Sequence, residues 1–193
     1  MANKIKYGLK NVHYAVATIS TSGTATYGTV KALPGAVSLS MEPQGENTPF
    51  YADNIAYWIG VSNTGYEGDL ELARVPDSFK IDVLNYYESA NGLLVEDANA
   101  AVKHFALMFQ FEGDEKATRH VLYNCTATRP TASGQTQGES IEPQTETISI
   151  KATTIYFSTI EKDVVKSETY DTTSSSVYNS WFSSVTTPTA TTN

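Results

Sequence analysis

Apolar and polar residues alternate along most of this chain, and a period of two predicts β-strands. The clearest run is 101–112 (AVKHFALMFQFE), where one face of the predicted strand is wholly apolar: Phe105, Leu107, Phe109 and Phe111. The opposite face carries His104, Ala106, Met108 and Gln110. A two-stranded hairpin is marginal in water by itself, so the phenylalanine face must cover a larger sheet or a helix.

Further runs with the same period bring the expected number of strands to between six and eight. They include 11–19, 30–41, 69–75, 121–128 and 144–157. In the second of these runs, Val37, Leu39 and Met41 are expected to share one face. Pro34-Gly35 in the same run predicts a bulge or kink.

Two segments have helical spacing instead. Pro76 suits a first helical turn, and Phe79 and Val83 follow one turn apart, which predicts a short amphipathic helix within 76–87. A second short helix is expected at about 174–185, with apolar positions at Val177, Tyr178, Trp181, Phe182 and Val185. A disordered Thr/Pro-rich tail is expected from Thr186.

These elements favour a mainly β fold: a β-sandwich or partly open barrel with one short flanking helix. We expect one domain over 1–165, followed by a Ser/Thr-rich segment at 166–193 that holds the C-terminal helix. Two long excursions interrupt the strands. They are an inter-strand arm at 42–68 and a polar surface loop at 129–142.

The arm is polar and interrupted by Pro and Gly, yet it carries five large aromatic residues: Phe50, Tyr51, Tyr57, Trp58 and Tyr66. Loops of this length are uncommon in compact domains and are usually functional or disordered. Since Tyr and Trp are enriched where proteins touch, the arm predicts a protein–protein contact. An alternative is that 54–61 folds back to lengthen two strands and places Tyr57, Ile59 and Val61 in the core.

Composition and motifs do not support catalysis. The 193 residues carry a formal net charge of −8, which disfavours non-specific binding of nucleic acid. Cys125 is the only cysteine and is expected to be a buried, inert thiol. The three histidines lack metal-ligand spacing, and no phosphate-binding loop or hydrolase motif occurs. We therefore expect no enzymatic activity, no cofactor and no metal, and, without a run of 18 apolar residues, no membrane segment.

Six short segments carry a resemblance to a known family. They are VSLSMEP (37–43), FYADN (50–54), GYEGDLEL (65–72), FQFEG (109–113), IEPQTETI (141–148) and WF (181–182). Their order and spacing strongly resemble those of the major tail proteins, or tail tube proteins, of phages with long, flexible, non-contractile tails. The resemblance spans nearly the whole chain and is weakest at 89–101 and in the Ser/Thr-rich tail.

The resemblance implies a structural virion protein. In such tails, β-sandwich subunits form rings, usually hexamers, whose inner sheets join into one barrel around a lumen. The rings stack around a tape-measure protein, between tail terminator and distal tail proteins, and genome DNA later passes through. Assembly takes place in the bacterial host cytoplasm, and the product is part of the virion.

The resemblance also implies that the arm reaches the adjacent ring, and that terminal segments make further contacts between subunits. The candidates for these contacts are Pro49, Phe50, Tyr51, Asp53, Asn54, Tyr57 and Trp58 in the arm, and Trp181 and Phe182 near the C-terminus. From the residues alone, Trp181 and Phe182 suit either the core of their own subunit or an open sheet edge of a neighbour.

Two other functions stay open at this point. A carbohydrate-binding or adhesin-like β-sandwich would use Tyr and Trp as a platform for sugars. A head–tail completion protein would assemble as a single ring and stop there.

Deletion of residues 44–51 is expected to leave the domain folded and to block stacking, because the arm is predicted to lie outside the core. Circular dichroism and electron microscopy of the purified variant test this expectation. Unfolding of the variant would place the arm in the core, and full-length tubes would remove its proposed role.

Overall fold

The chain folds mainly into antiparallel strands in the computed structural model, which describes residues 3–136, 138, 140 and 142–190. Within these residues the elements are β1 (Lys6–Ile19), β2 (Ala25–Tyr27), β3 (Lys31–Ala32), β4 (Ala36–Gln44), β5 (Asn47–Ala52), β6 (Ile55–Val61), β7 (Gly65–Leu72), α1 (Asp77–Asp82), β8 (Tyr87–Glu88), β9 (Leu94–Val95), β10 (His104–Gly113), β11 (Thr118–Ala127), β12 (Glu146–Thr153), β13 (Ile155–Phe157), β14 (Lys162–Val164), β15 (Lys166–Glu168) and α2 (Ser175–Ser180). The mainly β prediction is confirmed. The strands outnumber the expected six to eight because several are pieces of only two or three residues.

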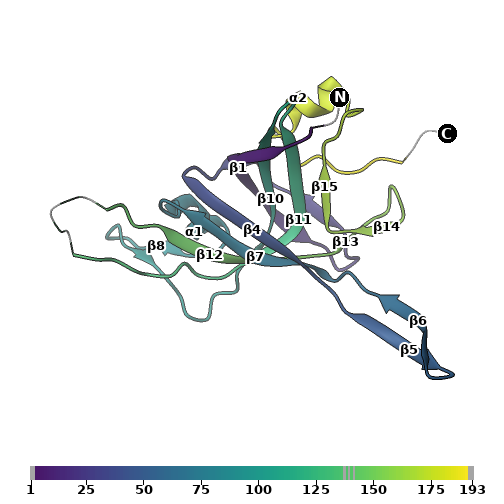
Figure 1. The fold of residues 1–193 in the computed structure, drawn as a ribbon. Helices are drawn as coiled ribbons and strands as arrows, with labels where there is room; N and C mark the ends of the chain where they lie inside the picture. Colours follow the sequence, from purple (N-terminus) through teal and green to yellow (C-terminus); the bar gives the residue numbers. More distant parts are fainter. Residues whose placement is uncertain (1–2, 137, 139, 141, 191–193) are drawn as a thin grey trace.

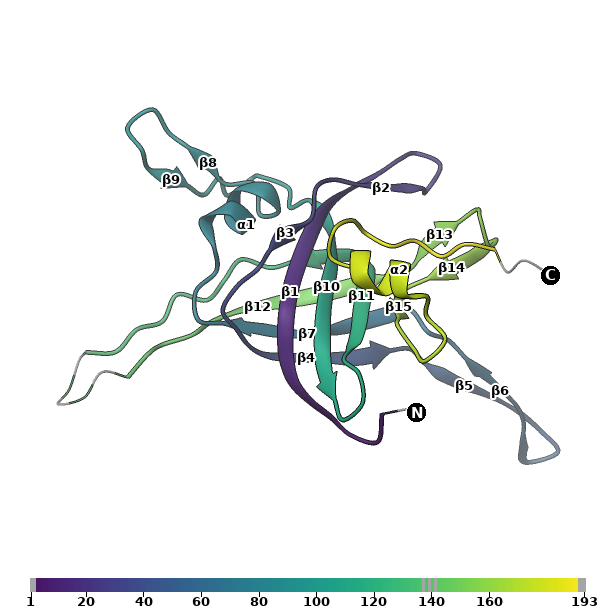
Figure 2. The same ribbon diagram turned by 90° about the horizontal axis from the view of Figure 1, so that it is seen from above.

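One sheet organises the fold, and it bends over itself at β11. Its path runs β2-β1-β10-β11-β12-β7-β4, with β15 added to β11 and β3 to β1. The first part of β11 pairs with β15, whereas its last residues pair with β12. As a result, β1, β10 and β11 form one layer that crosses over a second layer of β12, β7 and β4 (Figures 1 and 2). The two layers fit the predicted β-sandwich, and the described strands do not close into a barrel.

The main core lies between these two layers. Its fully buried members include Phe105 and Leu107 from β10, Leu70 and Leu72 from β7, and Ile148 and Ile150 from β12. These are the inward faces that the alternation predicts. Phe79, Val83 and Leu84 enter the same core from α1 and the turn that follows it, so this helix packs on the sheet as predicted.

A second apolar cluster covers the other face of β10 and β11. It joins Ala106, Met108, Val121 and Tyr123 of these strands to Ile155, Phe157 and Trp181 of the C-terminal third. Both faces of the β10–β11 pair are therefore buried inside one subunit. This explains why the second face of the predicted strand also carries apolar residues, Ala106 and Met108.

Two details of the predicted strands are wrong. The register between β4 and β7 shifts between Ala36 and Ser38, and this turns Val37 outward, where it is 53% exposed. Leu39 and Met41 still pack on the main core. The expected strand at 144–157 is divided after Thr153, and its last part, β13, pairs with β14 instead of continuing in the main sheet.

The C-terminal segment is more ordered than predicted. The hydroxyl of Ser174 accepts from the backbone N–H of Val177 and caps α2, which ends at Ser180, short of the predicted limit. The Tyr123 hydroxyl donates to the Thr186 carbonyl at 2.8 Å, and the Thr159 hydroxyl donates to the Pro188 carbonyl at 2.9 Å. The expected disorder from Thr186 is therefore wrong as far as Pro188, and residues 191–193 lie outside the described residues.

The predicted surface loop at 129–142 forms neither helix nor strand in its described residues. Residues 137, 139 and 141 of this loop lie outside the described part of the chain.

Substitution of Phe79 by Ala is expected to lower the free energy of unfolding by about 3–5 kcal/mol, the usual cost of removing a buried phenyl ring. Phe79 is fully buried and packs edge-on against Tyr14 and Phe105, with ring centroids 5.0 and 5.5 Å away. The matched control is Phe50→Ala, at a position 60% exposed, with an expected change below about 0.5 kcal/mol. Urea denaturation of unassembled subunits measures both, and equal losses would contradict this description of the core.

Candidate functional site

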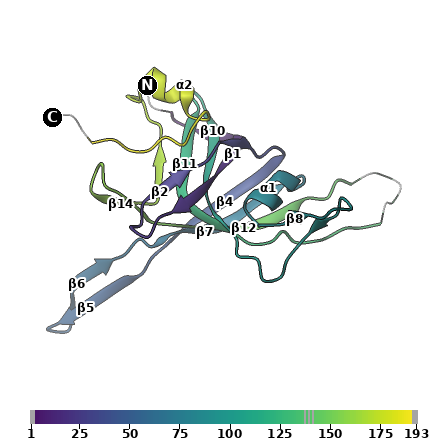
Figure 3. The ribbon, with the colours of Figure 1, turned by 180° about the vertical axis from the view of Figure 1, so that it is seen from behind.

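The arm is a two-stranded ribbon that continues the β4–β7 pair beyond the core. β5 and β6 pair with each other, and backbone hydrogen bonds join this pair to β4 and β7. The Thr64 N–H donates to the Gln44 carbonyl at 2.8 Å, and the Ser62 N–H donates to the Glu46 carbonyl at 3.0 Å. The ribbon projects from the domain at the end opposite to β8 and the 129–142 loop (Figures 1 and 3).

Glycine permits the close backbone contacts at the base of the arm. A Cβ atom on Gly45 would lie 1.9 Å from the Ser62 carbonyl oxygen. Gly65 has a φ of 140°, and a Cβ atom there would lie 2.0 Å from the Ala152 carbonyl oxygen. No side chain fits at these two positions. Glycine there allows the backbone hydrogen bonds of the β4–β7 pair to continue into the arm.

The tip of the arm is a two-residue turn at Asp53 and Asn54. Both residues have positive φ angles, 52° and 62°, as a type I′ hairpin turn requires. Asp and Asn tolerate this left-handed conformation better than other residues with a side chain. The turn pairs Ala52 with Ile55, and a register shift between Tyr51 and Phe50 then places Phe50 opposite Trp58.

Both faces of the arm are apolar. Phe50 opposes Trp58 on one face, and the pairs Pro49–Ile59 and Tyr51–Ala56 lie on the other, because successive residues of β5 alternate between faces. The large side chains are 54–77% exposed: Phe50, Tyr51, Ile55, Tyr57, Trp58, Ile59 and Val61. A ribbon of two strands cannot cover both of its own faces, so these side chains are left for another surface to bury.

The alternative interpretation of residues 54–61 is correct in one respect and wrong in another. The segment does lengthen two strands, as β6. However, Tyr57, Ile59 and Val61 do not join the core, since they are 70%, 54% and 77% exposed.

The structure brings together the seven arm candidates Pro49, Phe50, Tyr51, Asp53, Asn54, Tyr57 and Trp58. It places the two C-terminal candidates elsewhere, on the outer face of β10 and β11. Trp181 is 3% exposed, and its Nε1–H donates to the His120 carbonyl at 3.4 Å. Phe182 is half-buried and stacks on His13, with ring centroids 4.7 Å apart. Trp181 therefore packs in its own subunit, whereas the arm residues have no such cover.

The second layer, formed by β12, β7 and β4, has a polar, acidic outer face that the sequence did not single out as a site. While β4, β7 and β12 turn their apolar residues to the core, the opposite face presents Ser38, Ser40, Glu42, Glu67, Asp69, Glu71, Thr147, Ser149 and Lys151. The alternation in GYEGDLEL holds this information, because Leu70 and Leu72 point inward and their neighbours must point outward. Sequence alone did not show that acidic residues of two strands share one surface.

Hydroxyl groups hold the carboxylates of this polar face. Glu71 accepts from Thr145 at 2.6 Å and from Ser38 at 2.8 Å, and these two hydrogen bonds lower the pKa of its carboxyl group. Asp69 accepts from Ser149 at 2.6 Å, and Lys151 lies 3.9 Å from Glu67. This face is negatively charged at neutral pH because Glu42, Glu67, Asp69 and Glu71 outnumber Lys151 on it.

The described residues offer little for catalysis or metal binding. They contain no group of three or more His, Cys, Asp or Glu residues that could hold a metal ion. Cys125 is fully buried, as predicted, and burial raises the pKa of its thiol to about 12, which keeps it protonated. Among these same residues, no helix has the length and apolar character needed to cross a membrane.

Comparison with known proteins identifies the family. The chain matches the family model described as phage tail tube protein over residues 2–184. A search of curated proteins finds no matching relative. The match covers almost the whole chain and favours the tail tube interpretation over the carbohydrate-binding alternative. The chain therefore belongs to the phage tail tube protein family and is a structural component of the virion tail.

Proposed function

We propose that this protein forms hexameric rings that stack into the tail tube, through which the phage genome is delivered to the host. The observation that carries the proposal is the arm, whose two apolar faces have no cover within the subunit. Burial of apolar surface is the main driving force of protein association. A second subunit is the simplest source of that cover in a protein that builds a tube.

In this proposal, the arm residues make the contact between rings. Phe50, Tyr51, Tyr57 and Trp58 supply the large aromatic surface that dominates the energy of interfaces. Asp53 and Asn54 hold the turn, and Pro49 stiffens one strand. Trp181 and Phe182 have a secondary role, in which they fix the C-terminal segment against its own subunit before neighbours meet it.

The polar outer face of β4, β7 and β12 is proposed to line the lumen. Its carboxylates are Glu42, Glu67, Asp69 and Glu71, and phosphate is repelled by a surface of this sign. The outer edge of β4 has no strand partner among the described residues, so a neighbouring subunit can extend the sheet there. Six such sheets would form one continuous acidic wall.

The proposed partners follow from this architecture. They are further copies of the chain, a tape-measure protein inside the tube, and terminator and distal tail proteins at its two ends. DNA would pass without specific binding, and assembly would occur in the host cytoplasm. We propose no cofactor and no enzymatic activity.

Purified protein at high concentration is expected to form tubes that are visible by negative-stain electron microscopy. The matched variant replaces residues 46–62 with a two-residue Asn-Gly turn, which retains the pairing of β4 with β7. This variant is expected to stay folded and to stop at rings or monomers. Wild-type protein that stays monomeric, or armless protein that builds long tubes, would contradict the proposal.

Charge reversal in the proposed lumen is expected to slow the release of DNA without preventing assembly. Particles carrying Glu67→Lys and Asp69→Lys should release DNA several-fold more slowly, because the new cations bind phosphate, and added salt should restore the rate. The control carries Glu88→Lys and Asp97→Lys, which add the same charge near β8 and β9. Normal release by the first variant, or equal slowing in the control, would place the lumen on another face.

A further inference from the structure

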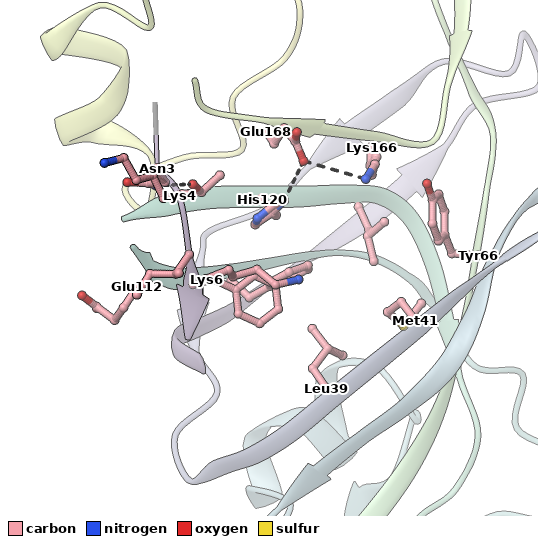
Figure 4. A pocket seen from close by; sticks show the side chains of 15 residues that line it. Asn3, Lys4, Lys6, Leu39, Met41, Tyr66, Glu112, His120, Lys166 and Glu168 are labelled. Carbon is pink, nitrogen blue, oxygen red and sulfur yellow. Dashed lines mark hydrogen bonds and ion pairs between the residues drawn. The ribbon is translucent and has the colours of Figure 1, made fainter. Parts of the chain in front are cut away.

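A cavity opens between the two layers of the subunit. Its walls are apolar, like the arm, but most of its charged side chains have the opposite sign to those of the arm. Its volume is about 510 Å³, within the range of sites that bury a ligand. Its walls include apolar side chains from both layers, among them Leu39, Met41, Phe109, Phe111 and Leu122. Leu39 and Met41 on β4 face His120 and Lys166 across the opening (Figure 4).

The rim of this cavity carries a small excess of positive charge, whereas the protein as a whole is acidic. Lys4, Lys6 and Lys166 lie on it, with Glu112 and Glu168 as its two carboxylates. Lys166 lies 3.8 Å from Glu168 and 5.2 Å from the centre of the Tyr66 ring. Lys6 lies over the Phe111 ring at 4.5 Å. The lysines thus place positive charge beside two half-buried aromatic rings.

The arm has the complementary character. Residues 42–68 contain four carboxylates, Glu42, Glu46, Asp53 and Glu67, and neither lysine nor arginine. Asp53 lies at the tip, next to the exposed aromatic side chains. Aromatic anchors that enter apolar pockets are the usual centre of an interface, and an opposite charge at the rim favours the correct partner.

The arm of the same subunit does not supply this occupant. The ribbon leads away from the two layers in the views of Figures 1 and 3. An arm and a cavity at different places on one molecule form a heterologous contact, which produces rings or filaments when it is repeated.

We propose that the cavity receives the tip of the arm, residues 50–58, from a second copy of the chain, with Asp53 against the lysines of the rim. The proposal rests on the proposed function and adds the surface on which the arm docks. The aromatic face of Phe50 and Trp58 then covers the apolar side chains of β4 and β10.

His120 lies on one wall of the cavity beside Glu168. His120 Nδ1 lies 3.1 Å from a carboxylate oxygen of Glu168, so Nδ1 carries the proton and Nε2 is an acceptor. Nε2 is buried and has no hydrogen-bond partner among the described residues.

Carbodiimide cross-linking of assembled tubes tests this contact directly, because it joins only a carboxylate and an amine that already touch. Tubes are built from an equal mixture of unlabelled and ¹⁵N-labelled full-length protein. Mass spectrometry should find Asp53 joined to Lys4, Lys6 or Lys166, in pairs that combine one labelled and one unlabelled peptide. Glu88, which is exposed at the far end of the subunit, is the internal control and should not join these lysines.

Charge exchange provides the second test. Asp53→Lys and Lys166→Glu are each expected to raise the concentration needed for tube formation several-fold, and the double variant should recover most of the loss. Asp97→Lys is the control for net charge. Because Lys166 is on the surface, with its side chain 43% exposed, these variants should remain folded.

The outcomes separate this inference from the proposed function. If wild-type tubes form but Asp53 is cross-linked to other lysines or to none, the cavity does not receive the arm. The proposal that the arm stacks the rings is not affected by that result. Lack of rescue in the double variant also overturns the contact, as does a bound hydrophobic molecule found in the cavity of assembled tubes. Wild-type protein that forms no tubes overturns the proposed function itself.

Discussion

The structure depends on one constraint: a strand pair that is apolar on both faces must be covered on both faces. β10 and β11 meet this constraint inside the subunit. The second layer (β12, β7 and β4) and α1 cover one face, and β13, β14 and the segment around Trp181 cover the other. The arm is also apolar on both faces, but its large side chains are exposed in the subunit. The difference between the core and the proposed interface in this protein is therefore whether the chain supplies its own cover.

The same sheet links the two surfaces that are proposed to stack the rings and to line the lumen. β4 and β7 carry the acidic face within the sandwich and continue as the arm beyond it. A force on the arm is thus transmitted through backbone hydrogen bonds to the strands that are proposed to line the lumen. The glycines at the base keep this connection unbroken where side chains would collide with the neighbouring backbone.

Sequence predicted the parts of the fold that follow from local periodicity. The apolar face of β10, the inward side of β7 and the helix after Pro76 are all in place. Pro34-Gly35 predicted a bulge in this run, but the outward turn of Val37 was missed, because the position of the register shift depends on how β4 pairs with β7. Trp181 was ambiguous for a related reason, since only the outer face of β10 and β11, assembled from distant segments, shows what it covers. The aromatic residues of the arm predicted a contact surface, and the structure shows these side chains exposed. The acidic face and the cavity could not be predicted, because each is built from strands that are far apart in sequence.

Tryptophan fluorescence during assembly tests the central claim most directly. The protein has two tryptophans, of which Trp181 is already buried and Trp58 is 61% exposed, so Trp58 alone reports on cover of the arm. The account predicts a blue shift and loss of acrylamide quenching as tubes form, both absent when Trp58 is replaced by Phe. Tubes in which Trp58 stays as accessible as in the free subunit would contradict the claim that another copy covers the arm.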